Sequence, residues 1–371
     1  MKRIAYIISF VNKSVNYEWT VELLNKEKFN LTFILLNNTN SYFEDFLRRN
    51  NIDTYRINYS GKKNFLTAVI TTVKILRNKK IEIVHAHLFD ACIIGLLAAK
   101  FIGIKKRIHT RHNATIHHQY HPNAVKYDKL INYLSTDIIA ISENVKNILI
   151  DMENADSKKI SIIHHGIKKS DFQHISLERI AKLKEKYHQN ESKRPVIGVI
   201  SRYIHWKGIQ YIIPAFIKIL NDFPKAHLIL ANAAGPYEME IKKQLSEIPA
   251  ENYTEILFED DIFALYKLFD IFVHTPIDKY SEAFGQIYIE TMAAEIPSVV
   301  TMSGIAHEFI KNQYNALVVP YNNSEEIYNS IYSLLVNKDM QKKIIENGLV
   351  DVEKLFTVDK MINELEELYE K

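Results

Sequence analysis

The sequence predicts a doubly wound α/β fold arranged as two domains, and three observations support this. The chain has 371 residues, which is more than a single hydrophobic core usually supports. Short β-branched runs alternate with helix-like segments from one end of the chain to the other. These runs are apolar almost without interruption, as in parallel strands that are covered on both faces. We therefore expect two parallel sheets, each flanked by helices.

The first half of the chain contains five strand-like runs. They are RIAYIISF (3–10), LTFILL (31–36), IEIVHAHL (81–88), RIHTRH (107–112) and DIIAIS (137–142). Helical patterns lie between them, at residues 65–77, 91–101 and 143–151. This order predicts a Rossmann-like domain.

The rhythm breaks near residues 166–172, and a second series of strands begins at residue 195. Its runs are PVIGVIS (195–201), AHLILA (226–231), EILF (255–258), DIFVHT (270–275), PSVVT (297–301) and ALVVP (316–320). A second Rossmann-like domain follows from this pattern. The segment 358–371 has the pattern of an amphipathic helix whose packing partner the pattern does not reveal.

Composition excludes several classes of protein. The chain is 47% hydrophobic and 25% charged, with a net charge of +3, and its cations form short clusters rather than one basic stripe. We therefore do not expect nucleic acid as a partner. The single cysteine, Cys92, lies in an apolar run and excludes an intrachain disulfide, which fits a reducing compartment.

The segment MKRIAYIISFVNKS resembles a signal peptide, but its apolar run is short and no small-residue cleavage site follows it. A buried first strand accounts for it better. No stretch reaches the roughly 18 apolar residues that a membrane span needs. The expected location is the cytoplasm.

The segment ISRYIHWKG leaves a strand and enters a helix near Gly208, with Arg202 and Lys207 on the connecting loop. A diphosphate at this place would meet a guanidinium, an ammonium and the positive end of a helix together. Two solvated surface cations are the alternative. A second loop, ANAAGPYEMEI (231–241), places Gly235 where a ligand could approach the backbone closely, although an ordinary strand-to-helix loop explains it equally well.

Two glutamates eight residues apart, Glu282 and Glu290, could form a carboxylate pair. The same spacing recurs at 247/255 and 251/259, so the spacing alone decides nothing. Context separates the pairs, because Glu282 lies directly after a strand and precedes Phe284, Gly285 and an apolar helix. Glu290 lies within that helix, where its charge needs a polar partner.

These motifs resemble the retaining glycosyltransferases of family four, which are nucleotide-sugar-dependent enzymes of the GT-B fold. The strongest matches are SRYIHWKG (201–208), similar to the family's G-R-x4-K-G block, and EAFGQIYIETMAAEIPSVV (282–300), similar to its E-x7-E block. Weaker matches follow in the family's order over nearly the whole chain. They are IEIVHAHL, RIHTRHN, DIIAISENVKNIL, HHGIKKSDF, AAGP, SGIAHEFI and YNALVVP.

The resemblance implies an architecture and a set of domain boundaries. The fold would be GT-B, with two Rossmann-like doubly wound domains facing across a cleft. In this family the last helix returns to the first domain. The expected domains are therefore residues 1–168 together with the C-terminal helix 356–371, on the acceptor side, and residues 169–355, on the donor side.

The resemblance also implies roles for individual residues. The proposed diphosphate ligands are Arg202 and Lys207, with Gly235 on the neighbouring loop. Glu282 would lie beside the transferred sugar, and Glu290 would accept hydrogen bonds from the ribose hydroxyls. The backbone at Phe284 and Gly285 would lie near sugar or phosphate. His112 would lie near the sugar and acceptor, with His109 as the competing choice, and Gly304 and Glu308 would lie on a loop near the donor.

The chemistry agrees with these residue types. A glycosidase needs a carboxylic acid to protonate a poor leaving group. A nucleotide diphosphate already leaves readily and needs compensation of its negative charge. Glu282 and Glu290 are therefore not expected to act as an acid–base dyad. The family implies retention of the anomeric configuration, with a phosphate oxygen taking the acceptor's proton.

No metal and no other cofactor is expected. Three groups of histidines suggest a metal site: His85/His87, His117/His118 with His121, and His164/His165. The family, however, carries a similar H-A-H run without metal. Strand alternation places His85 and His87 on one face. The run EDD at 259–261 is not the Asp-x-Asp of metal-dependent transferases.

The chain departs from the family pattern at several glycines. The family's glycine-rich first loop is replaced by VNKSVNYEWT, where only Glu18 keeps the pattern. Ala233, Glu295 and Ala316 each stand where the family commonly has glycine. Contacts between the first loop and donor phosphates are therefore not expected to be as close, and the sequence suggests no role for Glu295.

The expected function is transfer of a sugar from a nucleotide-sugar, UDP-linked by preference, to a saccharide or lipid-linked glycan acceptor in cell-surface polysaccharide or glycoconjugate synthesis. Two alternatives stay open: a GT-B epimerase acting on a UDP-sugar, and a two-lobed sugar-binding protein without enzyme activity. The segment LLAAKFIGIKKR (96–107) suggests weak association with an anionic membrane surface, on the inner face of the cell membrane. A buried helix followed by a basic loop is the favoured alternative for this segment.

Overall fold

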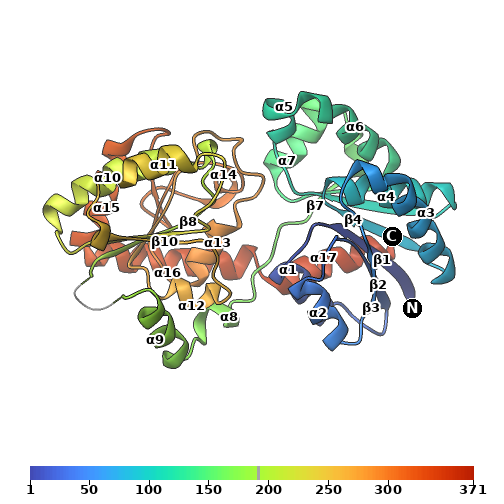
Figure 1. Ribbon diagram of the computed structural model, residues 1–371, viewed down its shortest axis with the longest axis horizontal. Helices are drawn as coiled ribbons and strands as arrows, with labels where there is room; N and C mark the ends of the chain where they lie inside the picture. The colour runs from blue at the N-terminus through green and yellow to red at the C-terminus, as the bar shows by residue number, and fades with distance from the viewer. Residues whose placement is uncertain (190–192) are drawn as a thin grey trace. The chain divides into compact units, whose positions relative to one another are not determined.

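The computed structural model describes residues 1–189 and 193–371, and these form two compact units (Figure 1). Unit 1 comprises Met1–Gly166 and Val358–Lys371, and unit 2 comprises Ile167–Thr357. The expected boundaries lay at 168/169 and 355/356.

Unit 1 is a seven-stranded parallel sheet with the strand order β3-β2-β1-β4-β5-β6-β7. Its strands are β1 (Lys2–Ser9), β2 (Phe29–Leu36), β3 (Asp53–Ile57), β4 (Ile83–His87), β5 (Lys106–Arg111), β6 (Asp137–Ala140) and β7 (Ile160–Ile162). Its helices are α1 (Val15–Leu23), α2 (Tyr42–Arg49), α3 (Phe65–Asn78), α4 (Phe89–Phe101), α5 (Ile116–Tyr120), α6 (Val125–Leu134), α7 (Glu143–Asn147) and α17 (Val358–Glu370). The strand order reverses between β1 and β4, which makes their carboxyl ends the place where ligands bind in such sheets.

Unit 2 is a six-stranded parallel sheet with the order β10-β9-β8-β11-β12-β13. Its strands are β8 (Val196–Ile200), β9 (His227–Ala231), β10 (Tyr253–Ile256), β11 (Ile271–His274), β12 (Ser298–Val300) and β13 (Leu317–Val318). Its helices are α8 (Ser170–Gln173), α9 (Leu177–Lys186), α10 (Ile209–Asp222), α11 (Glu238–Leu245), α12 (Ile262–Tyr266), α13 (Gln286–Ala293), α14 (Ala306–Phe309), α15 (Ser324–Val336) and α16 (Lys338–Leu355). Here the order reverses between β8 and β11.

All eleven predicted strands are present, and the parallel sheets confirm the predicted fold class. The central strands are buried on both faces; in β1, for example, residues 4–8 are at most 1% exposed. Two strands escaped prediction, β3 and β7. Both are outermost in their sheet and only partly buried, so they lack the continuous apolar run of a central strand.

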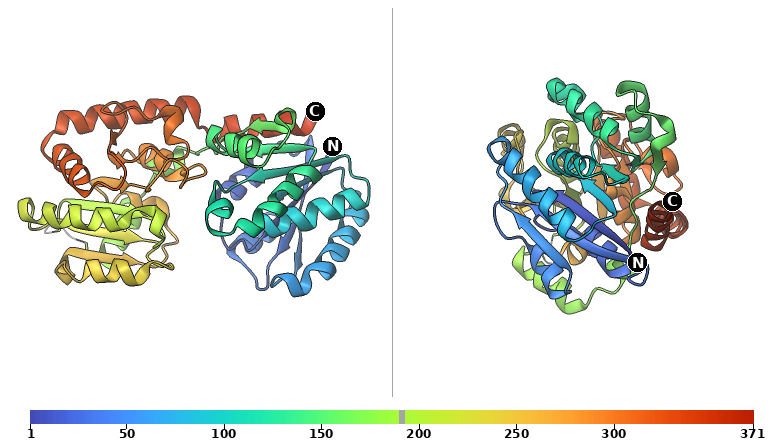
Figure 2. Two further views of the ribbon diagram at one scale, coloured as in Figure 1. Left: turned by 90° about the horizontal axis from the view of Figure 1, so that it is seen from above. Right: turned by 90° about the vertical axis from the view of Figure 1, so that its right-hand side faces the viewer.

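The final helix, α17, completes the core of unit 1. It lies beside α1 (Figure 1) and contributes buried side chains, among them Ile362 and Tyr369. The two ends of the chain lie near each other (Figure 2). Lys2 Nζ donates a hydrogen bond to the carbonyl oxygen of Tyr369 at 2.7 Å. The sequence did not reveal the packing partner of this amphipathic helix. The structure shows that it packs against α1, near the N-terminus of the chain.

Glu295 occupies the position that glycine prefers at the end of a helix. After α13, the N–H of Glu295 donates to Met292 O at 3.1 Å and the N–H of Ile296 donates to Thr291 O at 2.9 Å. This is the Schellman arrangement, in which the residue after the C-cap adopts a left-handed conformation. Glu295 does so with φ of 64°, and its side chain accepts a hydrogen bond from Gln173 at 3.0 Å.

We expect Glu295→Gly to raise the free energy of unfolding by about 1 kcal/mol, because glycine adopts this conformation without the steric cost of a Cβ. Urea unfolding of the wild type and the variant measures the change. Glu295→Ala is the matched control, since it also loses the hydrogen bond to Gln173 but keeps the Cβ. Equal stability of the Gly and Ala variants would contradict this explanation.

Candidate active site

The loop after β8 carries two of the predicted phosphate ligands. Arg202 is exposed, and within the described ranges its side chain forms no ion pair. Lys207 ends a short 3-10 turn and is followed by Gly208, the N-cap of α10, with φ of 76°. A Cβ at Gly208 would lie 1.8 Å from the carbonyl oxygen of Thr275, so only glycine fits there. The positive end of α10 therefore lies directly beside Lys207.

Glu282 lies in the loop after β11 with its carboxylate buried. Lys207 Nζ lies 2.5 Å from Glu282 Oε1, and His274 Nε2 lies 3.1 Å from the same oxygen. The backbone N–H of Glu282 donates to Ser303 Oγ at 3.0 Å. Burial opposes ionisation, but Lys207 and His274 outweigh it and lower the pKa of Glu282 to about 2. The carboxylate is therefore ionised at neutral pH, as one half of a buried ion pair.

The turn that enters α13 is shaped by two glycines. Gly285 has φ of 82°, and a Cβ there would lie 2.5 Å from the ring of Tyr288. Gly304, with φ of 57°, brings its loop so close that a Cβ would lie 2.6 Å from Phe284 O. The same oxygen accepts a hydrogen bond from Ile305 N at 2.8 Å, and the side chain of Phe284 is buried. These two loops therefore hold each other in place at the carboxyl end of the sheet.

Glu290 obtains the polar partner that its position in an apolar helix demands. The hydroxyl of Tyr266, on α12, donates to Glu290 Oε2 at 2.6 Å. Burial raises the pKa of Glu290, and the hydrogen bond from Tyr266 opposes that rise. No signal in the sequence points to Tyr266, which lies 24 residues away. Glu308, on α14, is exposed.

Gly235 is required by the protein's own backbone. Its φ is 155°, and a Cβ there would lie 2.3 Å from the carbonyl oxygen of Tyr203. Hydrogen bonds join the same two loops, from Tyr203 N to Ala234 O at 3.0 Å and from Tyr237 N to Tyr203 O at 2.9 Å. The loop after β9 thus braces the loop that carries Arg202.

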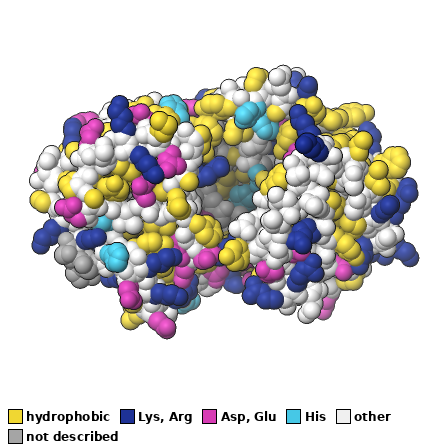
Figure 3. Space-filling model, in the orientation of Figure 1, with side chains coloured by type: hydrophobic (Ala, Val, Ile, Leu, Met, Phe, Trp, Pro, Cys, Tyr) yellow, Lys and Arg dark blue, Asp and Glu magenta, His cyan; other side chains and the backbone are white. Residues whose placement is uncertain are grey.

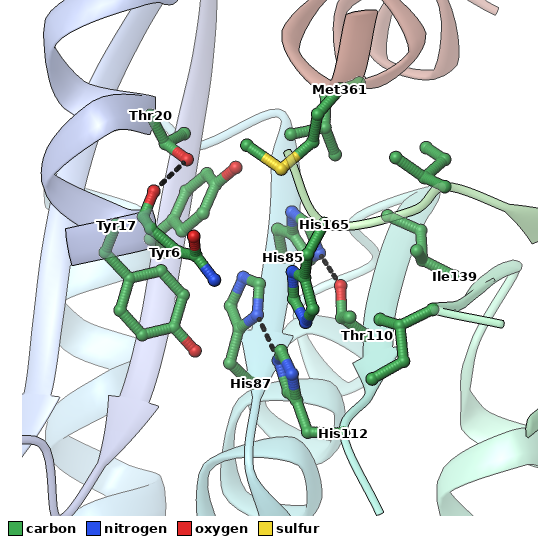
Figure 4. Close-up of a pocket in the computed structure, with 14 residues that line it drawn as sticks. Tyr6, Tyr17, Thr20, His85, His87, Thr110, His112, Ile139, His165 and Met361 are labelled. Atoms are coloured by element: carbon green, nitrogen blue, oxygen red, sulfur yellow. Dashed lines mark hydrogen bonds between the residues drawn. The ribbon is translucent and has the colours of Figure 1, made fainter. Parts of the chain in front are cut away.

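In unit 1, His112 follows β5 directly and lines a pocket at the carboxyl end of the sheet (Figure 4). Its Nε2 lies 3.1 Å from His87 Nδ1, and its ring stacks on that of His165 with centroids 5.7 Å apart. Burial lowers the pKa of His112 to about 4. His112 is therefore an uncharged hydrogen-bonding group at neutral pH. The competing candidate, His109, is fully buried and lines a different cavity of the unit.

His85, which lines this pocket, lies in a chain of hydrogen bonds. Its Nε2 lies 2.8 Å from Thr110 Oγ1, as Figure 4 shows. Its Nδ1 lies 2.7 Å from the hydroxyl of Tyr369, which in turn bonds the hydroxyl of Tyr6. The rings of His85 and His87 are 4.1 Å apart, as strand alternation predicts. Burial lowers the pKa of both histidines. Within the described ranges, no group of three or more His, Cys, Asp or Glu residues is placed to hold a metal ion.

The segment 96–107 divides into a buried helix and an exposed end. Leu96, Ala98 and Ala99 are fully buried, so the helix itself belongs to the core. Phe101, in contrast, is 75% exposed. Lys100 Nζ lies 4.4 Å above the ring of Tyr133, which is itself largely exposed. On the face seen in Figure 3, lysines and arginines are scattered rather than gathered in one stripe, and no described helix is long and apolar enough to cross a membrane.

Each unit of the protein matches a family model of glycosyltransferases over most of its length. The model for "Glycosyltransferase Family 4" matches residues 21–170, and the model for "Glycosyl transferases group 1" matches residues 181–350. The capsular polysaccharide biosynthesis glycosyltransferase CapM of Staphylococcus aureus is 25% identical over 354 residues, 88% of this chain and 91% of that protein. An Escherichia coli UDP-Gal:alpha-D-GlcNAc-diphosphoundecaprenol alpha-1,3-galactosyltransferase is 22% identical over 373 residues, 94% of this chain and 90% of its own.

The fold has close counterparts among solved structures. That of Anabaena HepE in complex with UDP and glucose superimposes with a TM-score of 0.85 over the whole of both chains, at 18% identity. The two parallel-sheet units therefore define the GT-B fold. With a family 4 domain in its first part and a group 1 domain in its second, the protein is a glycosyltransferase.

We expect unit 1 to lose stability as the pH falls from 7 towards 4. Burial, reinforced by Arg111, lowers the pKa of His109 to about 3, whereas an unfolded histidine titrates near 6.5. Between these values the unfolded chain binds a proton that the folded chain does not, so the stability present above pH 6.5 is lost on acidification. His109 alone accounts for about 2 kcal/mol at pH 5.

Urea unfolding at pH 7.5 and 5.0 measures this loss. Each unit contains one tryptophan, so Trp206→Phe leaves Trp19, which is buried in unit 1, as the reporter. In that background His109→Phe should lose less stability between the two pH values than its parent. Identical losses would show that His109 does not contribute.

Proposed function

We propose that the protein is a retaining glycosyltransferase that moves a sugar from a UDP-linked donor to a saccharide or lipid-linked glycan, in cell-surface polysaccharide or glycoconjugate synthesis. The names of its relatives support this choice of substrates. CapM is a capsular polysaccharide enzyme, the Escherichia coli relative uses UDP-Gal and a diphosphoundecaprenol-linked sugar, and HepE was crystallised with UDP and glucose.

The observation that carries the proposal is the pairing of Lys207 with Glu282 at the point where the strand order of unit 2 reverses. Ligands of doubly wound sheets bind at this place. An ionised Glu282 has no proton to give, so it does not serve as a general acid towards a leaving group. Its role in this proposal is to hold Lys207 in position and to contact the transferred sugar.

The donor's diphosphate would be held by Arg202, Lys207 and the backbone at the start of α10. Arg202 brings a guanidinium that is free of ion pairs with described residues, and such a group matches phosphate oxygens two at a time. Phe284 and Gly285 would supply backbone groups near the sugar or phosphate. Glu290, oriented by Tyr266, would accept hydrogen bonds from the ribose hydroxyls.

The bond between sugar and diphosphate breaks as negative charge develops on the departing phosphate. Arg202, Lys207 and the dipole of α10 would compensate this charge, so the step requires neither a metal ion nor another cofactor. Attack of the acceptor hydroxyl from the same face retains the anomeric configuration, and a phosphate oxygen takes its proton. His112, neutral at pH 7, would orient the sugar and acceptor by hydrogen bonding rather than by charge.

We expect Arg202→Ala to weaken binding of UDP-sugars by about tenfold to a hundredfold, the usual value of a charge-assisted hydrogen bond. Its melting temperature without ligand should not change, because the side chain is exposed and makes no ion pair with described residues. Thermal-shift titration with UDP-, GDP- and ADP-sugars measures both quantities. Lys207→Ala should lose the ligand-induced shift and also melt at lower temperature, because Glu282 then lacks its cation.

Lys218→Ala is the matched control, since Lys218 lies in the same unit and is also paired with a glutamate, Glu325, but at the surface. It should retain the full ligand-induced shift. Failure of every nucleotide-sugar to stabilise the wild type would overturn the donor site. Conversion of a UDP-sugar to its epimer without any acceptor would favour the epimerase alternative.

We also propose weak association with anionic membrane surfaces through the exposed end of α4. Phe101 and Tyr133 supply exposed aromatic groups there. Lys100 lies over the ring of Tyr133, and Lys105 is exposed four residues after Phe101. Aromatic rings favour the membrane interface, and each lysine near an anionic surface contributes about 1 kcal/mol.

Phe101→Ser should reduce co-sedimentation with liposomes that contain phosphatidylglycerol severalfold, whereas liposomes of phosphatidylcholine alone should bind neither protein. Leu177→Ser, which removes an equally exposed apolar side chain from unit 2, is the control and should bind as the wild type does. Equal binding by Phe101→Ser and the wild type would exclude this surface.

A further inference from the structure

His274 is the last residue of β11, and it lies beside the ion pair of the proposed donor site. Its Nε2 lies 3.1 Å from Glu282 Oε1, the same oxygen atom that Lys207 Nζ approaches to 2.5 Å. Its ring contacts the ring of Tyr288 edge-on, with centroids 5.1 Å apart. The side chain of His274 is only 3% exposed. A buried histidine and a lysine therefore share one carboxylate oxygen.

His274 is uncharged in this arrangement. An ionised carboxylate can only accept hydrogen bonds, so the ring hydrogen of His274 is on Nε2 and donates to Glu282. Burial and the charge of Lys207 lower the pKa of His274, and the contact with Glu282 opposes this fall without reversing it. The ring is therefore neutral at pH 7, and the charge of Glu282 is balanced by Lys207.

The elements packed against β11 bring little further charge to His274. The neighbouring strands β8 and β12 carry no titratable residue, since their sequences are VIGVI and SVV. On α13, burial raises the pKa of the Tyr288 hydroxyl, which stays protonated. Glu290 lies on the same helix, but its Oε2 accepts a hydrogen bond from Tyr266 at 2.6 Å. The charge of His274 consequently depends on the ion pair beside it and on any charge that a ligand brings.

The charges of the proposed donor site do not balance those of a nucleotide-sugar. Each of the two phosphates in such a donor has one ionisable oxygen, so the diphosphate carries a charge of −2. Arg202 and Lys207 supply two positive charges, and Glu282 removes one of them, which leaves +1. The positive end of α10 adds about half a charge. A bound diphosphate would therefore leave an excess of negative charge near His274.

We infer that His274 takes up a proton from the solvent when the donor binds, so that its imidazolium becomes the partner of Glu282 while Lys207 turns to the diphosphate. A negative charge nearby favours the charged form of a histidine, and a buried carboxylate that loses its cation is strongly destabilised. One proton meets both demands and brings the side-chain charge from +1 to +2, equal and opposite to the diphosphate. The diphosphate as ligand rests on the proposed function, whereas the contact between His274 and Glu282 does not.

Proton uptake gives the donor affinity a definite pH dependence. Binding raises the pKa of His274 from its lowered value in the free protein. The affinity is therefore highest at low pH, where the free protein already carries the proton, and it falls as the pH rises through the pKa of the bound state. Each unit by which binding raises this pKa corresponds to about a tenfold difference in affinity between the two limits.

Isothermal titration calorimetry of the full chain with UDP-glucose, between pH 5.5 and 8.0, tests the inference. At each pH the titration is repeated in buffers that differ in their enthalpy of ionisation, because the difference in heat counts the protons taken up. UDP-glucose is the probe because neither of its phosphates titrates in this range, whereas the terminal phosphate of UDP titrates at about pH 6. We expect uptake of up to one proton and an affinity that rises on acidification.

His274→Gln keeps an amide donor for Glu282 but cannot take up a proton. It should bind UDP-glucose without proton uptake, about tenfold more weakly than the wild type at pH 5.5 and equally well at pH 8.0. The matched control is His205→Gln, because His205 is an exposed histidine on the same loop as Lys207. It should take up as many protons as the wild type. If His274→Gln does not fold, His274→Asn, which is smaller and also carries an amide, takes its place.

The inference is overturned if the wild type binds UDP-glucose without taking up a proton at any of these pH values; the donor site would then stand and only the role of His274 would fall. It is equally overturned if His274→Gln takes up as many protons as the wild type. Loss of the uptake in His205→Gln alone would assign the proton to His205 instead. Failure of the wild type to bind UDP-glucose would overturn the UDP donor of the proposed function together with this inference.

Discussion

The ion pair between Lys207 and Glu282 is the constraint around which the loops of unit 2 are arranged. A carboxylate so deeply buried is stable only with its cation, and Lys207 and His274 meet it on one oxygen atom. This single contact ties the loop after β8 to the loop after β11. Two glycines allow further close contacts between backbone segments here. Gly208 lies against the carbonyl oxygen of Thr275, and Gly304 lies against the carbonyl oxygen of Phe284. Arg202 is exposed on the loop that these contacts hold, which suits the phosphate-binding role proposed for it.

The pocket of unit 1 differs from the ion-paired loops of unit 2, because it is lined by uncharged groups. Burial keeps His85, His87 and His112 uncharged. Each of them hydrogen-bonds another histidine or a hydroxyl, although His87 Nε2 has no partner among the described residues. The buried guanidinium of Arg111 lies 2.6 Å from Asp128 Oδ1 and 2.6 Å from Glu153 Oε1, so it is not free to bind an anion. The two halves therefore differ in the charge they present. Unit 2 offers cations suited to a diphosphate, whereas unit 1 offers uncharged donors and acceptors suited to hydroxyl groups.

The architecture could be predicted from the sequence because central parallel strands must be apolar on both faces. Such strands appear in the sequence as apolar runs that are almost uninterrupted. The sequence did not reveal β3 and β7, since edge strands such as DTYRI need to be apolar only in part. Within the candidate site, the glycines and post-strand charges were visible because turns and strand ends restrict residue types. Tyr266 and His274 were not, because each acts through a partner elsewhere in the chain that only folding brings near. Glu295 was noticed only as an anomaly, and its explanation required the backbone geometry after α13.

The position of α17 has a consequence for how the protein is made. This helix closes the core of unit 1, and its Tyr369 bonds His85 and Tyr6, yet all of unit 2 is synthesised before it. While the chain emerges from the ribosome, its first 166 residues lack the helix that completes their core until α17 has been synthesised. Unit 2 is continuous in sequence and has no such delay. The half that begins the chain is thus the last to be completed, so a chain cut short before α17 would lack part of the core of its N-terminal half.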